Sequence, residues 1–214
     1  MKLLTRSPGG HVVPGYEIIL NEGLDCIIEK IAQLKKGFQP EDDEYHFYEA
    51  EMILAKAASE CILRYVQEAE KLKNIKLKKK IAETCRWIAH NKPRTFYEAV
   101  QLLWFLHEFC LEDASGCVIS VGRIDQILYP FYEYDLKTGK IDERKAYTII
   151  LALWKKFALN DHGFQNIALG GVDVYGKDAC NDLTRMCLDA SIETHTEQPA
   201  LILRVHAGMP DSIW

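Results

Sequence analysis

The chain has 214 residues and a mass of 24.5 kDa, with 48% hydrophobic and 27% charged residues. This globular composition excludes a disordered tail, a collagen and a coiled-coil rod, and the length suffices for a core without disulfides or metals. The formal net charge of −5 argues against nucleic acid as the main partner.

The first half of the chain is predicted to be mainly helical. One helix is expected from Ile18 to Lys36, broken by Gly37 and Pro40. The next helix carries apolar residues at steps of three and four, so that they form one stripe while the polar remainder faces water. The stripe consists of Phe47, Ala50, Leu54, Ala57, Cys61 and Tyr65.

Two further helices follow before the middle of the chain. The basic run from Lys71 to Lys80 is interpreted as the solvated face of a helix start, and that helix extends from Leu77 to His90. Thr95 is predicted as the N-cap of the next helix, in a capping box with Glu98. The following residues are apolar almost all round, which indicates a helix buried on most sides.

The last third of the sequence reads as strand, helix and strand. A short strand is expected from Cys117 to Val121, and Asp142 is predicted to cap a helix. Strands from Gln165 to Leu169 and from Leu201 to His206 flank a helix from Asn181 to Thr194, which suggests a parallel βαβ unit.

Cysteine use and hydropathy indicate the compartment. The seven cysteines include no CxxC pair, which favours a reducing cytoplasm. No apolar run approaches the ~20 residues of a membrane span. The apolar start Met1–Leu4 is too short for a signal peptide.

The segment Gly171–Asp178 nearly matches a phosphate-binding P-loop between a strand and a helix. Its last position should be Ser or Thr, whose hydroxyl binds magnesium, and it is Asp178 instead. Asp173 adds a second carboxylate that would repel a triphosphate. The alternative is a glycine-permitted turn between strand and helix.

No metal or hydrolase signature is found. A G-x-S-x-G motif is absent. Six histidines lack paired partners at i, i+3 or i+4, and each is interpreted as a hydrogen-bonded structural residue. They are His46, His90, His107, His162, His195 and His206.

The segment Ile119–Gln126 is unusual because a predicted strand leads directly into Gly, Arg, Asp and Gln residues. Arg123 and Asp125 are expected to form a structural ion pair that fixes the turn after the strand. Ser120 places a short hydroxyl at the carboxyl end of that strand, where a side chain can face a ligand crevice.

Several segments, in this order, resemble the glycyl radical enzymes of the pyruvate formate-lyase family. No single segment is specific to the family, but the segments together are. Their pattern is closer to the glycerol/diol dehydratase and choline-lyase branch than to pyruvate formate-lyase itself. The segments are Pro93–Gln101 with Trp104, Ser120–Gln126 with Tyr129-Pro130, Leu169–Asp173, Gly176–Ala179, Asn181–Thr184 and Pro199–His206.

The resemblance implies a helix-rich α/β fold that is part of a ten-stranded barrel with surrounding helices. Residues 1–214 are then a single partial pyruvate formate-lyase-type domain, with 1–112 as a mainly helical outer layer and 113–214 as the first barrel strands and helices. In the family, a radical-SAM activase installs a glycyl radical, which passes to a cysteine inside the barrel. The enclosed site keeps the radical from solvent.

The resemblance implies that two residues of this chain line the substrate pocket. His11 matches an early family histidine that hydrogen-bonds substrate hydroxyls, and Ser120 matches a serine that lines the same pocket. A neutral histidine and a hydroxyl suit a polyol-like ligand.

The catalytic elements of the family are not matched. The catalytic cysteine lies in Gly-Cys-x-Glu, whereas Gly116–Ile119 has Ile in place of Glu and occurs at a different place in the order of motifs. The radical glycine lies in Arg-Val-x-Gly-Tyr, which Arg204–Met209 echoes only superficially. The chain is expected to stop before either element, so no catalytic residue is assigned.

We therefore expect a cytoplasmic fragment of a glycyl radical dehydratase or lyase, acting on a small polyol- or choline-like substrate by C–O or C–N cleavage. It would supply scaffold and part of the pocket, bind no cofactor or metal itself and not be catalytically competent alone. Its expected partners are the rest of the barrel or a second copy, because a partial barrel exposes strand edges, together with the activase. The alternatives are a non-catalytic binding module for a small molecule or partner, and a nucleotide binder.

Overall fold

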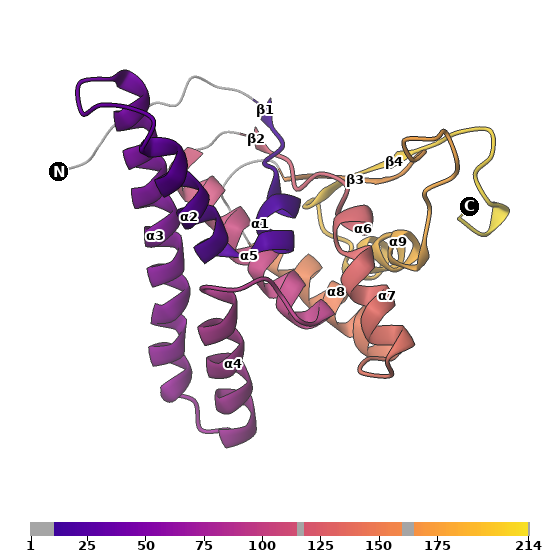
Figure 1. The fold of residues 1–214 in the computed structure, drawn as a ribbon. Coiled ribbons are helices and arrows are strands. Elements are labelled where there is room, and N and C mark those ends of the chain that lie inside the picture. The colour runs from indigo at the N-terminus through magenta and orange to yellow at the C-terminus, as the bar shows by residue number, and fades with distance from the viewer. Residues whose placement is uncertain (1–10, 115–117, 160–164, 214) are drawn as a thin grey trace. The chain divides into compact units, whose positions relative to one another are not determined.

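The computed structural model describes residues 11–114, 118–159 and 165–213, and the chain forms two compact units. Residues 15–94 make up one unit, which consists of helices. The other contains residues 95–214 and the N-terminal segment up to Pro14, and it holds all the described strands (Figure 1).

The helical unit contains α1 (Tyr16–Glu22), α2 (Leu24–Lys35), α3 (Asp43–Glu70) and α4 (Ile75–Ile88). The single helix expected at Ile18–Lys36 is wrong, because the chain breaks at Gly23. This residue has φ +87°, and a Cβ there would lie 2.5 Å from the backbone nitrogen of Lys92. The approach of a second backbone segment, which the local pattern does not reveal, causes the break.

Helix α3 confirms the predicted helix, but its buried side is not the expected stripe. It lies beside α2 and α4 (Figure 1) and buries Ser59, Ile62 and Ala69 against them. Phe47 and Leu54 of the stripe remain 58% and 60% exposed. The helix therefore presents one apolar side to its neighbours in the unit and a second one to the solvent.

The helices of the other unit are α5 (Phe96–Ala114), α6 (Ile124–Ile127), α7 (Tyr129–Lys137), α8 (Glu143–Leu159), α9 (Asp182–Thr194) and the 3-10 turn η1 (Asp211–Ile213). The predicted burial of α5 is confirmed, since most of its apolar side chains lie in the core. Thr95 accepts from the amide of Glu98 at 3.2 Å, and Asp142 caps α8 by accepting from Lys145 at 2.8 Å.

Four short strands run parallel: β1 (His11–Val12), β2 (Val118–Ile119), β3 (Asn166–Gly170) and β4 (Ala200–Arg204). The chain beyond β2 continues the sheet, since the amide of Val121 donates to Asn166 and Gly122 bridges Ile167. The strands thus follow one another in sequence order, and β3–α9–β4 is the predicted parallel βαβ unit. This helix-rich arrangement with a small sheet is consistent with part of a larger α/β fold.

Candidate functional site

Because the strands are parallel, their carboxyl ends lie at the same edge, where α/β proteins bind ligands. Gly170 and Gly171 end β3 with φ of +63° and +82°. A Cβ on Gly170 would lie 3.0 Å from the sulfur of Cys180, and one on Gly171 would lie 3.1 Å from Cβ of Arg204. Only glycine satisfies both the backbone conformation and the space.

The expected ion pair of Arg123 and Asp125 has another geometry, because each side chain binds the backbone at the end of β3. Asp125 accepts from the amide of Gly170 at 2.8 Å, and Arg123 donates to the carbonyls of Gly170 and Val172. Asp125 thus binds the amide of Gly170, and Arg123 binds its carbonyl. Burial raises the pKa of the Asp125 carboxyl, which hydrogen bonds and the charge of Arg123 partly oppose.

Asn181 joins this network to the start of α9. Its side chain accepts from the amides of Leu183 and Thr184 and donates to the carbonyl of Asp125 at 3.1 Å. Thr184 accepts in return from the amide of Asn181 and donates to Asp125 at 2.6 Å. The Asn-x-x-Thr spacing of a capping box could have identified this end of the helix from the sequence.

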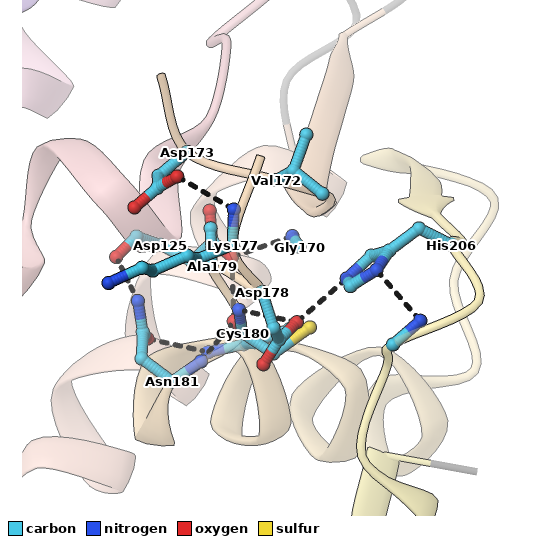
Figure 2. Close-up of polar contacts among 12 residues, drawn as sticks. Asp125, Gly170, Val172, Asp173, Lys177, Asp178, Ala179, Cys180, Asn181 and His206 are labelled. Carbon is cyan, nitrogen blue, oxygen red and sulfur yellow. Dashed lines mark hydrogen bonds and ion pairs between the residues drawn. The ribbon is translucent and has the colours of Figure 1, made fainter. Parts of the chain in front are cut away.

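Asp178 and His206 connect the segment after β4 to the segment before α9 (Figure 2). Nε2 of His206 lies 2.9 Å from Oδ1 of Asp178, while Nδ1 accepts from the amide of Gly208 at 3.2 Å. The two ring nitrogens thus link Asp178 to the backbone that follows β4. Partial burial raises the pKa of Asp178, but hydrogen bonds from His206 and Cys180 outweigh it and lower the pKa overall.

The P-loop-like segment is a closed turn (Figure 2). The carboxylate of Asp173 accepts from the amides of Tyr175 and Lys177 at 2.8 and 2.9 Å, and Val172 bridges Asp178 in antiparallel fashion. The amides that a phosphate would need already bind a carboxylate of the protein. This geometry supports the turn rather than the nucleotide site.

The thiol of Cys180 lies beside the same network, half-buried under Gly170. Burial raises its pKa to about 11, and the neighbouring carboxylate of Asp178 adds to the shift. The thiol is therefore protonated at neutral pH, and it packs against the glycine rather than acting as a thiolate nucleophile.

Ser120 lies between β2 and β3. Its amide donates to Val12 at 2.8 Å, and its hydroxyl donates to the carbonyl of Asn166 at 2.8 Å and accepts from the amide of Gly122 at 3.3 Å. His11 pairs through its backbone with Val118, while its side chain lies outside the described part of the structure. The motif around Cys117 also falls outside the described residues.

The described ranges contain neither a metal-binding cluster nor a membrane-spanning helix. No group of three or more His, Cys, Asp or Glu side chains could hold a metal ion there. No helix in those ranges is long and apolar enough to cross a bilayer. Three of the histidines interpreted as structural are confirmed as hydrogen-bonded, since His107 contacts Gln165 at 2.9 Å, His90 contacts Asp25 at 3.1 Å and His206 contacts Asp178.

The family model described as pyruvate formate lyase-like matches residues 1–214. The chain belongs to this family. Within it, the 4-hydroxyphenylacetate decarboxylase glycyl radical subunit of Clostridioides difficile is 32% identical over 95% of the chain and 26% of its own length. The (2S)-3-sulfopropanediol dehydratase of Klebsiella oxytoca is 31% identical over 94% of the chain and 28% of its own length.

The fold of this pyruvate formate lyase-like chain also matches solved structures. A glycyl radical enzyme from Archaeoglobus fulgidus has a TM-score of 0.86 and 31% identity, covering 96% of the chain and 30% of the larger protein. The chain thus spans between a quarter and a third of the length of these pyruvate formate lyase-like relatives. The glycyl radical relationship read from its motifs is confirmed.

Proposed function

We propose that the chain forms one part of a glycyl radical enzyme of the dehydratase- and lyase-like branch. In this proposal, residues 1–214 are a single partial domain, with 1–112 as outer helices and 113–214 as the first strands and helices of the barrel. The observation that carries the proposal is the order of four parallel strands, together with a match over 96% of this chain to a structure three times its size.

Ser120 is proposed to line the substrate pocket together with His11. Its hydroxyl proton is used on Asn166, which leaves one oxygen lone pair for a ligand hydroxyl beside the amide of Gly122. This arrangement suits a small polyol- or choline-like substrate with a hydroxyl to donate. The proposed reaction is cleavage of a C–O or C–N bond, and a relative that is a dehydratase supports the former.

The radical itself is proposed to come from outside these residues. The family resemblance implies a glycyl radical that a radical-SAM activase installs and that passes to a cysteine, which would abstract hydrogen from the substrate. The described residues do not fit the radical segment, since Gly208 follows β4 in a different motif and its amide donates to His206. The chain would therefore contribute the pocket and scaffold, and it would need the rest of the barrel as partner.

The decisive experiment is activation under anaerobic conditions. The polypeptide or complex that carries this sequence in its source organism is incubated with the cognate activase, and its electron paramagnetic resonance spectrum is recorded beside that of the 214-residue chain alone. We expect a glycyl radical signal in the former only. A radical signal and turnover by the 214-residue chain alone would refute its assignment as a non-catalytic part.

A binding module without catalysis is the second candidate, favoured by the remaining acceptor site on Ser120. Titration calorimetry of the full chain with glycerol, propane-1,2-diol or choline should give heat that Ser120→Ala abolishes. Ser191→Ala is the matched control, because only the backbone of Ser191 has a described hydrogen bond. Heat that is equal in all three proteins would place binding elsewhere.

A further inference from the structure

The two sides of the sheet differ in burial. On one side lie apolar residues that are at most 4% exposed, namely Ile119, Val121, Ile167 and Leu169. Ile119 packs there against Leu111 of α5. Successive side chains of a strand point to opposite sides, so that the residues between these four lie on the other side. We call this second side, which is less buried, the open side of the sheet.

Ser120 and Asn166 are neighbours on the open side. The amide of Val121 and the hydroxyl of Ser120 both donate to the carbonyl of Asn166, at 2.9 and 2.8 Å, which places the two residues side by side on adjacent segments of the sheet. Adjacent strands are about 4.8 Å apart. Both residues are half-buried, so that a ligand of a few atoms can contact both side chains at once.

The side-chain amide of Asn166 is available to a ligand. Its backbone carbonyl accepts from Ser120 and Val121, but no residue of the described part of the chain forms a hydrogen bond with its side chain. An Asn side chain has two N–H donors and one carbonyl acceptor. Since polar groups that are withdrawn from bulk water are almost always hydrogen-bonded, a half-buried amide without a protein partner is suited to bind a ligand.

The adjacent side chains of β3 and β4 on the open side are small or apolar and carry no charge. Ala200 pairs with Asn166 in the register of the two strands, and Ile202 pairs with Ala168. Both alanines are half-buried, and Ile202 is 55% exposed. The alanines leave room beside the amide, and the apolar surface suits the carbon atoms of an uncharged ligand better than a charged group.

We propose that Asn166 is a substrate-binding residue, which binds the second hydroxyl of a vicinal diol whose first hydroxyl donates to Ser120. Ser120 offers an oxygen lone pair for the first hydroxyl, since its proton is used on the carbonyl of Asn166. The amide of Asn166 accepts from the second hydroxyl through Oδ1 or donates to it through Nδ2. The inference rests on the proposed function and narrows its substrate class, because choline has only one hydroxyl and carries a positive charge.

The side-chain amide itself provides the readout. In a two-dimensional amide NMR spectrum of the full chain, the side-chain signal of Asn166 is identified by its loss in Asn166→Ala. We expect this signal to shift during titration with propane-1,2-diol. The signal of Asn21, an exposed residue of α1 that Asn21→Ala identifies in the same way, should stay in place.

The same titrations give the affinities. Asn166→Ala should weaken the binding of propane-1,2-diol about fivefold, which corresponds to the loss of one hydrogen bond. The matched variant Asn21→Ala should leave it unchanged. Propan-1-ol has a single hydroxyl, so that the wild type and Asn166→Ala should bind it equally well. Circular dichroism checks that the variants fold.

The outcomes separate this inference from the proposed function. Diol binding that Ser120→Ala abolishes but Asn166→Ala leaves unchanged would overturn the inference and keep the proposed pocket. Diol binding that Asn166→Ala weakens and Ser120→Ala does not would support Asn166 as a ligand residue and contradict the proposed role of Ser120. If the wild type does not bind the diol, the inference is wrong, whereas the radical experiment decides the proposed function independently.

Discussion

At the scale of single residues, the end of β3 depends on buried polar side chains that bind specific backbone and side-chain partners. Asp125 is fully buried and accepts from a backbone amide and from a threonine hydroxyl. Removing an acceptor from such a network is costly, because each buried polar group left without a partner bears its full desolvation cost.

Removing this carboxylate should therefore be costly. Asp125→Ala leaves the amide of Gly170 and the hydroxyl of Thr184 without their acceptor, and we expect a loss of about 3 kcal/mol in the free energy of unfolding. Urea denaturation followed by circular dichroism measures it. The control Asp189→Ala, at an exposed position of α9, should change stability by less than about 0.5 kcal/mol.

A buried histidine makes stability depend on pH. His107 is fully buried, and burial lowers its pKa to about 4 although its hydrogen bond to Gln165 opposes the shift. The folded state therefore binds this proton less readily than the unfolded state, whose histidine titrates near pH 6.5. The contribution of His107 to stability is fully present above about pH 6.5 and is lost as the pH falls toward 4.

We expect this loss to amount to about 3 kcal/mol across that interval. Urea denaturation at a series of pH values between about 7 and 4 measures it. The variant His107→Gln keeps a donor for Gln165 but does not titrate, so that its stability should fall much less over the same range. Equal pH slopes in the two proteins would contradict the assignment.

At the scale of elements, helix ends decide where the chain turns. Helix α9 begins with the complete capping box of Asn181 and Thr184 and ends at His195, the one described non-glycine residue with a positive φ, of 49°. A left-handed residue at this position is normally glycine, which has no Cβ to clash with the backbone.

Replacing this histidine should stabilise the protein. His195 is exposed, and its only described hydrogen bond is through the backbone. His195→Gly is expected to raise the free energy of unfolding by about 0.5–1 kcal/mol. Thermal denaturation compares it with His195→Ala, which keeps a Cβ at this φ and should give no gain.

At the scale of the whole molecule, β4 lies at the edge of the described strands. The amide of Ala200 donates to Gln165 beside β3. Because successive residues of a strand point to opposite sides, the amides of Ile202 and Arg204 also point to β3, whereas those of Leu201 and Leu203 point outward. In the barrel that we propose, the next strand would cover them.

Amide hydrogen exchange tests this edge. In the 214-residue chain we expect Leu201 and Leu203 to exchange faster than Ile202 and Arg204. In the larger polypeptide or complex proposed above, the outward amides should become protected while those facing β3 hardly change. Slow exchange at Leu201 and Leu203 in the 214-residue chain would indicate that this edge is already paired.

Local and patterned features of this protein could be read from its sequence. The capping residues Thr95 and Asp142, the buried helix α5 and the βαβ unit all follow from spacing and hydrophobic period, because these depend on neighbours in the chain. The family relationship could be read as well, since its motifs follow one another over most of the chain.

The tertiary structure alone decided what depends on residues far apart in sequence. The break at Gly23 comes from the backbone at Lys92, and the side of α3 that is buried comes from the positions of α2 and α4. Arg123 and Asp125 do not simply pair, because Gly170, more than forty residues later, offers each of them a backbone partner. These contacts depend on packing between segments that are distant in the sequence, and a local sequence pattern does not predict such packing.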